Sequence, residues 1–379
     1  MILIDQGLQK LKTYIEENDY RGHDPYDALK SPFFTWPILR SNKLIRFGTQ
    51  QLAKRLPFSI RPLLLVPKGY NPVTLGLSIQ AYAFLYKADP ENKATYLKKI
   101  NHLVKELKTL IPDGFSGACW GYDFDWEARY STIDAYEPSV VATGIITNAM
   151  FIAYQETGCR ECANLIISAS QFVVKDLNRI YDGSSFCFSY SPFDEEEVFN
   201  ASLKGARLLA QAYTIKKEIE FFKLAKSAVQ FVINHQREDG SWGYSLHSKG
   251  GWTDNYHTGY VLDCLDEYQK RTNDDEYDAH IKKGYLFYKN NFINSNGSPK
   301  FYFDKTYPID CTSAAQTILT HIRFGNEEIA QGVATWMIEN MQKNDGSFKF
   351  RKFRYYTIKT SFMRWSDAWM FAALANLKL

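Results

Sequence analysis

The chain has 379 residues, of which 45% are hydrophobic and 16% are aromatic, so it can bury a core and is not a disordered protein. Its formal net charge of +3 at pH 7 is too small to indicate nucleic acid as a partner. The six cysteines are scattered, and the C-x-x-C motif of Cys159 and Cys162 has no second pair to complete a zinc site. We therefore expect buried thiols and neither a metal nor another cofactor.

Residues 2–17 are expected to form an amphipathic helix, followed by a polar loop to residue 30. This N-terminal segment has neither the basic start nor the apolar run of a signal peptide. No stretch of the sequence has the apolar length that spans a bilayer. Together with reduced cysteines, these features predict a cytoplasmic protein.

The segment 31–68 is basic, and no aspartate or glutamate occurs from Ser31 to Tyr86. Its cations are Arg40, Lys43, Arg46, Lys54, Arg55, Arg61 and Lys68. Three interpretations are open: a solvated basic helix over 43–56 beside an apolar packing strip, a contact with an anionic substrate, or a peripheral contact with an acidic membrane surface. We expect these cations to face the mouth of the protein or a partner.

From residue 71 onward, a polar helix-capping residue followed five positions later by a small residue recurs six times. The predicted caps lie roughly 54 to 68 residues apart, a spacing typical of repeated helical hairpins. Each cap can accept hydrogen bonds from the free N–H groups of the first helical turn. The predicted caps are Asn71, Ser139, Asn200, Asp254, Asp310 and Asp367.

Amphipathic outer helices are expected to alternate with the capped inner helices. Their predicted ranges are 91–110, 160–178, 217–236, 277–292 and 327–342. An Asp-Gly or Asn-Gly turn with an aromatic strip stands between each outer helix and the next inner one, because glycine adopts positive φ without strain. The pattern predicts an all-α fold, an (α/α)6 toroid of six helical hairpins. We expect one domain over 1–379, with 1–60 supplying closing helices and the basic segment.

Three motifs carry a resemblance to known proteins: Q-x-x-D-G-S-W at 236–242, W-G-Y-D-F-D-W-E-A-R at 120–129 and D-N-Y-H-T-G-Y at 254–260. The chain resembles the α/α-toroid proteins, which include terpene cyclases, protein prenyltransferase subunits, sugar epimerases, glycoside hydrolases and polysaccharide lyases. It is more closely similar to the VpsJ-like group encoded in bacterial exopolysaccharide biosynthesis loci. The resemblance covers nearly the whole chain and implies a setting in polysaccharide metabolism, but it implies no single reaction.

The predicted N-termini of the inner helices converge on one mouth of the ring. Their free N–H groups and positive dipole ends favour an anionic or polyhydroxylated ligand. The candidates for acid–base catalysis are Asp125, Glu137, Tyr256, His257 and Asp310. The candidates for substrate binding are Trp120, Asp123, Trp126, Arg129, Trp252, Asp254, Asn255, Tyr307, Arg364, Trp365 and Asp367.

We expect acid–base chemistry on an anionic sugar or oligosaccharide: epimerisation, elimination or hydrolysis. Asp125 or Glu137 is expected to supply the carboxylate, and His257 or Tyr256 to transfer the proton. Arginines would hold the anion, and tryptophans would stack on sugar rings. In the alternative interpretation, Asp125 and Arg129 pair with each other as a loop anchor and His257 packs inward.

Two other functions are open. The first is an enzyme acting on isoprenoid diphosphates, which would need a deep aromatic funnel. The second is a non-catalytic glycan-binding or scaffold protein that keeps the ring without an acid–base pair. The sequence contains no glycine-rich phosphate loop, no H-E-x-x-H and no G-x-S-x-G motif.

Overall fold

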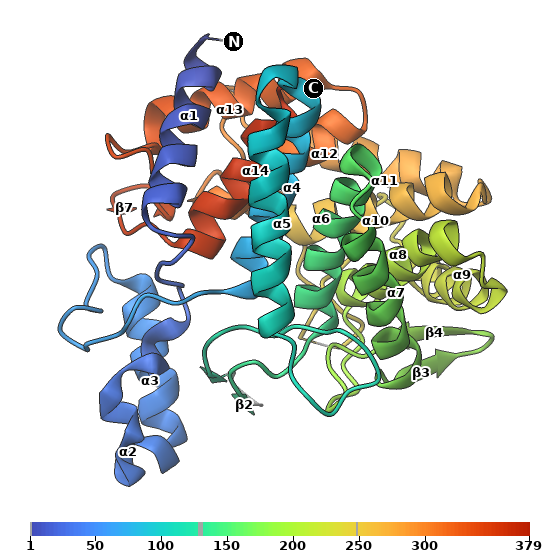
Figure 1. The fold of residues 1–379 in the computed structure, drawn as a ribbon, viewed down its shortest axis with the longest axis horizontal. Helices are drawn as coiled ribbons and strands as arrows, with labels where there is room; N and C mark the ends of the chain where they lie inside the picture. The colour runs from blue at the N-terminus through green and yellow to red at the C-terminus, as the bar shows by residue number, and fades with distance from the viewer. Residues whose placement is uncertain (1, 128–131, 248) are drawn as a thin grey trace.

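The computed structural model describes residues 2–127, 132–247 and 249–379, and its helices form a ring of hairpins (Figure 1). Within these ranges, the inner helices are α4 (Pro72–Ala88), α6 (Val140–Thr157), α8 (Phe199–Lys216), α10 (Asn255–Thr272), α12 (Cys311–Arg323) and α14 (Trp369–Asn376). The outer helices are α1 (Ile2–Glu17), α5 (Lys93–Thr109), α7 (Arg160–Lys175), α9 (Ile219–Asn234), α11 (Asp278–Asn291) and α13 (Glu327–Met341). The predicted (α/α)6 toroid is confirmed. None of the described helices is long and apolar enough to cross a membrane.

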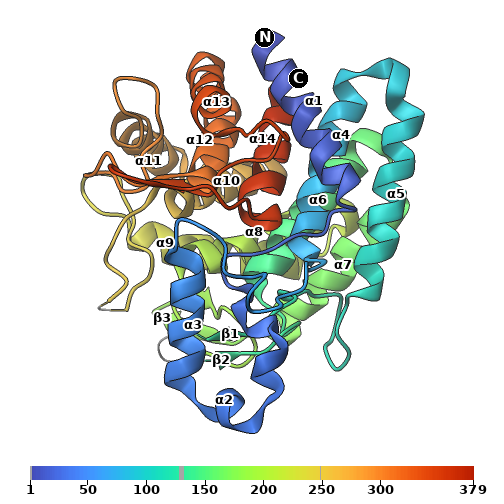
Figure 2. The ribbon, with the colours of Figure 1, turned by 90° about the vertical axis from the view of Figure 1, so that its left-hand side faces the viewer.

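The inner helices form a closed ring because each packs against the next and α14 packs against α4. In α4, apolar side chains on opposite faces are buried, such as Leu75 and Leu77 at 0% exposure, so this helix has no solvent-facing side over most of its length. The outer helix α1 packs against α13 and α14, and Lys378 Nζ lies 2.7 Å from Asp5 Oδ1. The two ends of the described chain are therefore close together (Figures 1 and 2).

Four of the predicted caps stand at the N-termini of inner helices. The side chains of Asn71, Ser139, Asp254 and Asp310 each accept a hydrogen bond from a backbone N–H in the first turn. These bonds satisfy donors that a buried helix end would otherwise leave unpaired.

The other two predicted caps are wrong in detail. Helix α8 begins at Phe199 with Val198 at the N-cap, so Asn200 lies inside the first turn. Asp367 lies in a π-helical turn, Met363–Ala368, that precedes α14. Its carboxylate accepts hydrogen bonds from the Phe348 N–H at 2.8 Å and from the Ser361 hydroxyl. Burial raises the pKa of Asp367 to about 7.

The Asp-Gly and Asn-Gly turns have the predicted left-handed backbone, with φ between 60° and 92° at Gly114, Gly183, Gly240, Gly297 and Gly346. Short strands follow or border these turns. They are β1 (Trp126–Glu127), β2 (Thr132–Ile133), β3 (Arg179–Asp182), β4 (Ser185–Phe188), β5 (Ile309–Asp310), β6 (Arg351–Lys352) and β7 (Thr357–Ile358). The pairs β1–β2 and β3–β4 are antiparallel, as is the three-stranded sheet β5–β6–β7.

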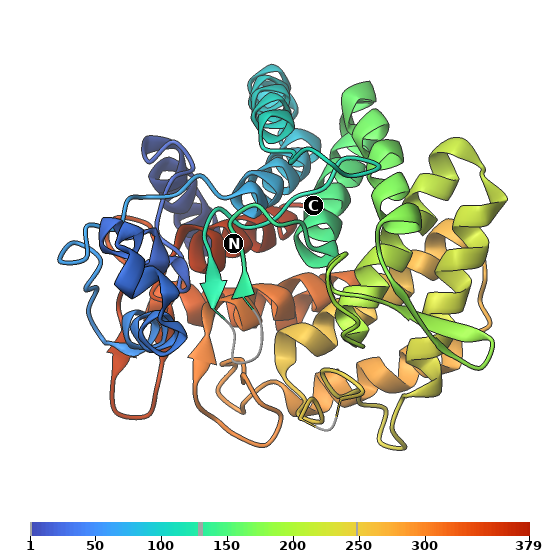
Figure 3. The ribbon, with the colours of Figure 1, turned by 90° about the horizontal axis from the view of Figure 1, so that it is seen from below.

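Helices α2 (Pro37–Ser41) and α3 (Lys43–Arg55) stand apart from the ring and project from the end that carries β1 and β2 (Figures 1 and 2). Seen from below, they lie at the edge of the molecule beside the inner helices (Figure 3). Helix α3 packs against the 3-10 turn Asp27–Lys30 and against β1. The N-terminal segment thus reaches the end of the ring where the inner helices begin.

The substitution Gly240→Ala, which replaces a turn glycine, is expected to lower the free energy of unfolding by about 1–3 kcal/mol. Its φ is +92°, and an added Cβ would lie 2.6 Å from the backbone oxygen of Lys283. The control is Gly332→Ala in α13, where an added Cβ meets nothing within 4 Å. This variant should be neutral or more stable by roughly 0.5–1 kcal/mol. Urea denaturation of both proteins checks the prediction, and equal midpoints would contradict it.

Candidate functional site

A cavity of about 320 Å³ lies where the N-terminal ends of the inner helices meet, and we call it the aromatic cavity. Most of its lining side chains are aromatic. Among the described residues, these are Tyr26, Tyr122, Phe124, Trp126, Tyr190, Tyr244, Trp252, Tyr256, Tyr260, Trp365 and Trp369. The remaining lining residues are Val141, Ile145, Asn200, His257, Thr312 and Arg364. Such a lining of flat apolar faces with a few polar groups is typical of a small-molecule site.

The aromatic strips after the glycine turns supply side chains both to the core and to this cavity. Trp120 is fully buried and donates its indole N–H to Leu107 O at 2.8 Å, whereas Tyr122 lines the cavity. Trp242 and Tyr244 repeat this division two hairpins further along the ring. Because successive side chains of an extended segment point to opposite sides, residues two apart would share one side if the strip were straight. The strip must therefore bend between the two aromatic residues.

His257 and Tyr256, the two proton-transfer candidates, both line the cavity, and His257 carries the basic nitrogen. Its Nδ1 lies 2.8 Å from Asp254 Oδ2, and its backbone N–H donates to Asp254 Oδ1 at 2.9 Å. A carboxylate can only accept, so Nδ1 carries a proton and Nε2 is the basic nitrogen of the neutral ring. Among the described residues, Nε2 has no hydrogen-bond partner, and His257 lines the aromatic cavity. The cap of α10 thus also orients an imidazole towards the cavity.

The rings around His257 hold it in place. The centroids of Tyr244, Trp252 and Tyr256 lie 4.7, 5.4 and 4.1 Å from that of the imidazole. Burial raises the pKa of Tyr256 well above its ordinary value, so its phenol stays protonated and can donate a hydrogen bond. The cavity therefore combines one titratable imidazole with phenols that remain neutral.

Asn200 adds an unsatisfied acceptor to the cavity. The residue is 3% exposed and lines the cavity, and its Oδ1 has no hydrogen-bond partner within residues 2–127, 132–247 and 249–379. A buried amide oxygen without a donor is unfavourable, because desolvation is not repaid by a hydrogen bond. A ligand hydroxyl placed here would satisfy it.

Arg364 brings the cation to the cavity wall, where Asp24 holds it. Arg364 Nε and Nη2 lie 2.5 and 3.0 Å from the two carboxylate oxygens of Asp24, more than 300 residues earlier in the chain. The Nε–H and one N–H of Nη2 are therefore occupied by Asp24, whereas Nη1 has no hydrogen-bond partner among the described residues. The guanidinium carbon lies 4.6 Å from the centroid of the Tyr122 ring.

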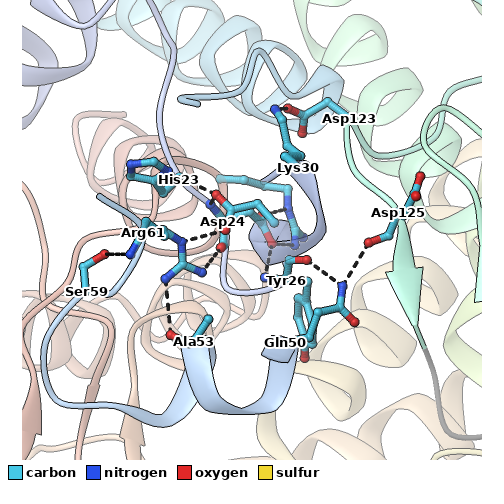
Figure 4. Close-up of polar contacts among 12 residues, drawn as sticks. His23, Asp24, Tyr26, Lys30, Gln50, Ala53, Ser59, Arg61, Asp123 and Asp125 are labelled. Carbon is cyan, nitrogen blue, oxygen red and sulfur yellow. Dashed lines mark hydrogen bonds and ion pairs between the residues drawn. The ribbon is translucent and has the colours of Figure 1, made fainter. Parts of the chain in front are cut away.

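The loop that carries Asp24 is itself fixed by buried polar contacts (Figure 4). Arg61 is fully buried, and its Nε donates to Asp27 Oδ1 at 2.6 Å. Gln50 donates through Nε2 to the backbone oxygens of Tyr26 and Asp125 at 2.7 and 2.9 Å. These bonds position the Tyr26 ring against the cavity.

Three cations of the basic segment form ion pairs within the protein, contrary to the prediction that they face the mouth or a partner. Arg61 pairs with Asp27, Arg46 Nε lies 2.8 Å from Glu127 Oε2, and Lys43 Nζ lies 3.6 Å from Glu127 Oε1. Arg40 and Arg55 are exposed and have no ion-pair partner among the described residues.

The structure brings six of the predicted site residues to the aromatic cavity. They are Trp126, Trp252, Tyr256, His257, Arg364 and Trp365. Asp254 stands directly behind His257 and does not itself line this cavity. Arg129 lies outside the described residues.

Three predicted binding residues are used to build the protein. Trp120 is in the core, as described above. Asp123 is buried and accepts hydrogen bonds from Lys30 Nζ and Asn71 Nδ2, both at 2.7 Å. Asn255 is fully buried and bonds to Thr317 at 3.0 Å. Their polar atoms are occupied, so they do not reach a ligand.

The predicted carboxylates also lie away from the cavity lining. Asp125 Oδ1 accepts from the Ala135 N–H at 3.0 Å. Glu137 lies at the base of the same loop, where its Oε2 accepts a hydrogen bond from the backbone N–H of Asp134 at 3.4 Å. Asp310 is fully buried and accepts from Arg351 Nη2 at 2.7 Å. Tyr307 and Asp367 likewise do not line the cavity.

The other eleven lining residues were not predicted as site residues, and they include Tyr26, Tyr190, Asn200 and Trp369. Tyr190 could have been found, because it follows the buried Phe188 by two positions, as Tyr122 follows Trp120. Tyr26 has no comparable signal, since it reaches the cavity only through the tertiary placement of the N-terminal loop.

Comparisons with known proteins show a similarity of fold and no match in sequence. No protein-family model matches the sequence, and no curated protein matches it. A sugar epimerase from a ruminal bacterium has 11% identity and a TM-score of 0.62, covering 82% of this chain and 89% of that chain. A cellobiose 2-epimerase from Bacillus thermoamylovorans has 12% identity and a TM-score of 0.60, with 81% and 87% covered. An unsaturated glucuronyl hydrolase specific for heparin has 14% identity and a TM-score of 0.57, with 80% and 85% covered. The chain therefore has the fold of these α/α toroids.

Proposed function

We propose that the protein is an enzyme that performs proton transfer on a sugar or oligosaccharide bound in the aromatic cavity. The observation that carries this proposal is the Asp254–His257 pair, whose unpartnered Nε2 belongs to a residue of the cavity wall. An imidazole oriented by a carboxylate is a common general base. The proteins of similar fold, two sugar epimerases and an unsaturated glucuronyl hydrolase, support a carbohydrate ligand.

In this proposal the neutral imidazole removes a proton from a sugar carbon next to a carbonyl group. The proton moves to Nε2, and Asp254 stabilises the imidazolium through the Nδ1–H bond. A neutral phenol such as Tyr256 can donate a hydrogen bond to the developing oxyanion. Return of the proton to the other face of the carbon gives an epimer, and loss of a neighbouring leaving group gives an elimination product.

Hydrolysis by paired carboxylates is less well supported. Glycosidases of the common type place two carboxyl groups on either side of the scissile bond. None of the described residues that line the aromatic cavity is an aspartate or a glutamate. Epimerisation and elimination need no such pair, so they are favoured.

The cavity also suggests the kind of sugar. Trp126, Trp252 and Trp365 offer faces on which pyranose rings can stack, and Asn200 Oδ1 can accept from a hydroxyl. The free Nη1 of Arg364 can bind a carboxylate, so we propose an anionic sugar such as a uronate. The motifs at 120–129 and 254–260 support a role in bacterial exopolysaccharide metabolism.

The aromatic lining also favours a second candidate, an enzyme acting on isoprenoid diphosphates. A diphosphate needs several cations or carboxylate-bound metal ions to hold it. Among the described residues of the cavity wall, Arg364 is the permanent cation, and Asp24 already pairs with it. The carbohydrate function is therefore preferred.

We further propose that segment 31–68 attaches the protein to an acidic membrane surface. Large apolar side chains are exposed throughout it. The most exposed are Leu44 (81%), Ile38 (80%), Leu63 (78%), Trp36 (64%), Phe58 (61%), Leu65 (61%) and Leu52 (53%). We call this set the apolar patch.

The arrangement of α3 supports a membrane partner. Arg46, Gln50 and Ala53 form its buried face, and Leu44 and Leu52 lie on the opposite side of the helix. An added Cβ at Gly48 on that side would meet nothing within 4 Å. The exposed cations Arg40, Lys43, Arg55 and Lys68 accompany the apolar patch. Apolar and basic side chains together are typical of segments that bind acidic lipid interfaces.

The proton-transfer role of the Asp254–His257 pair can be tested by following deuterium uptake from D2O into candidate sugars by proton NMR. His257→Gln is expected to slow uptake by about 10²–10⁴-fold, because Nε2 can no longer take the proton. Asp254→Asn keeps a helix cap and should also slow uptake, since the carboxylate that supports the imidazolium is lost.

The matched control for the Asp254–His257 pair is His235→Gln. His235 bonds to Phe231 O and does not line the cavity, so uptake should stay at the wild-type rate. Wild-type uptake in His257→Gln would remove the proton-transfer role and favour a glycan-binding protein.

The class of ligand can be tested by thermal stabilisation. A uronate oligosaccharide is expected to raise the melting temperature more than its neutral counterpart and more than farnesyl diphosphate, because selective binding to the folded state adds stability. Trp252→Ala should weaken this effect by removing a stacking face. A larger shift with farnesyl diphosphate would instead support the isoprenoid function.

Membrane attachment can be tested by flotation with vesicles of phosphatidylglycerol and phosphatidylcholine. Binding is expected at low salt and should decrease as salt screens the basic side chains. Leu44→Asp should lower the bound fraction by about tenfold, because burial of a leucine contributes about 1.5–3 kcal/mol. The control is Leu286→Asp in α11, which is 58% exposed but outside the apolar patch. Equal binding of the two variants would argue against the proposal.

A further inference from the structure

A second cavity, of about 280 Å³, lies inside the ring towards the C-terminal ends of the inner helices. Ile145, Tyr260 and Trp369 line both cavities and so form the layer between them. We call the second one the charged cavity. Among the described residues, its charged lining side chains are Glu156, Lys204, Arg207, Asp263, Glu267, Lys270, Arg271 and Arg323.

The buried carboxylates of the charged cavity already have partners. Glu267 accepts from Arg271 Nε at 2.7 Å and from Arg323 Nη1 at 3.0 Å. Asp263 accepts from Gln316 Nε2 at 2.7 Å, and Arg323 Nε lies 3.7 Å from its other oxygen. These acidic groups are therefore compensated by cations and amides other than Lys204 and Arg207.

Lys204 and Arg207 remain without an acidic partner. Lys204 is 1% exposed, and among the described residues its ammonium has no hydrogen-bond or ion-pair partner, although it lies 3.7 Å from the centroid of the Tyr260 ring. Arg207 is 6% exposed and donates through Nη2 to Gly144 O at 2.8 Å, but its Nε has no hydrogen-bond partner in the part of the chain that the structure describes. The two residues are three apart on α8, so they share one face of the helix. Two buried cations side by side without an anion are unfavourable.

The titration of Lys204 agrees with this arrangement. Burial lowers the pKa of Lys204 to about 7; Cys264 and Asp263 of α10 oppose this shift, and Arg207 on its own helix adds to it. The amine is therefore expected to lose its proton near neutral pH when no anion is bound beside it. A bound anion would favour the ammonium and raise this pKa.

We propose that the charged cavity binds a small anion whose carboxylate or phosphate group lies between Lys204 and Arg207. Gln155 and Lys270 are exposed at the rim, so the cavity is open to solvent above the two buried cations. Its volume suits a small metabolite rather than a polymer. This site is separate from the aromatic cavity, and the proposal does not rest on the proposed function.

Binding can be measured by isothermal titration calorimetry in chloride-free buffer with three probes: inorganic phosphate, glucuronate and glucose. Saturable binding is expected for phosphate or glucuronate, and the one that binds identifies the anionic group, while glucose should not bind at this site. Lys204→Met and Arg207→Gln should each weaken binding by about 10- to 100-fold, because each removes a charge-assisted hydrogen bond. If glucuronate binds, its affinity should fall between pH 6 and pH 9 in the wild type but not in Lys204→Met.

The matched control is Lys270→Gln, since Lys270 lines the rim of the same cavity, is 52% exposed at its side chain and pairs with Asp266. Its affinity should stay within about threefold of the wild type. Lys204→Met should remain folded, because it replaces a buried unpaired cation with an apolar side chain of similar length. The proposal is overturned if neither anion binds, or if Lys204→Met binds as tightly as the wild type. It is also overturned if glucuronate binding is lost in His257→Gln and kept in Lys204→Met, since the anion then occupies the aromatic cavity.

Discussion

Each inner helix packs between two inner neighbours and an outer helix, so most of its backbone has no access to water. Along the helix this has no cost, because every N–H finds its carbonyl within the same helix. At the N-terminus the first N–H groups have no such partner, and a buried unsatisfied donor costs about 1–3 kcal/mol. The side chains of Asn71, Ser139, Asp254 and Asp310 supply the missing acceptors. Polar residues therefore stand where these four helices enter the ring, whereas α8 and α14 begin without a side-chain cap.

This requirement places polar and ionisable side chains at the end of the ring where the inner helices begin. Asp254 satisfies the first turn of α10 and the imidazole of His257 with the same carboxylate. Asp310 similarly caps α12 and pairs with Arg351. Asn200 sits inside a helix instead of at its cap, and among the described residues its buried amide oxygen has no hydrogen-bond partner. This departure from the capping pattern occurs at a residue that lines the aromatic cavity.

The parts of the fold that depend on local patterns could be predicted from the sequence. The caps and glycine turns predicted the positions of the hairpins, because a cap or a turn depends only on residues that are neighbours in the sequence. The roles of Trp120 and Tyr122 could not be separated in this way, since both are aromatic and only the bend of the strip sends one to the core and the other to the cavity.

Contacts between distant parts of the chain were beyond local patterns. Asp125 and Asp123 were expected at the site because they are charged residues in a loop. Asp123 is instead neutralised by Lys30 and Asn71, which come from other elements. Likewise, no residue near Arg364 in the sequence predicts its ion pair with Asp24. Long-range pairing of this kind depends on the three-dimensional path of the N-terminal loop, which the spacing of residues does not reveal.

The packing of α1 against α13 and α14 has a consequence for how the protein is made. During synthesis, α1 leaves the ribosome long before its partners exist, so its apolar face, with Leu11 and Ile15, has to wait for more than 300 further residues. The hairpins between can form as they emerge, because their contacts are local. Joining the two ends is then the step with the greatest sequence separation, and until it occurs the nascent chain is an open arc with an uncovered edge for chaperones to recognise.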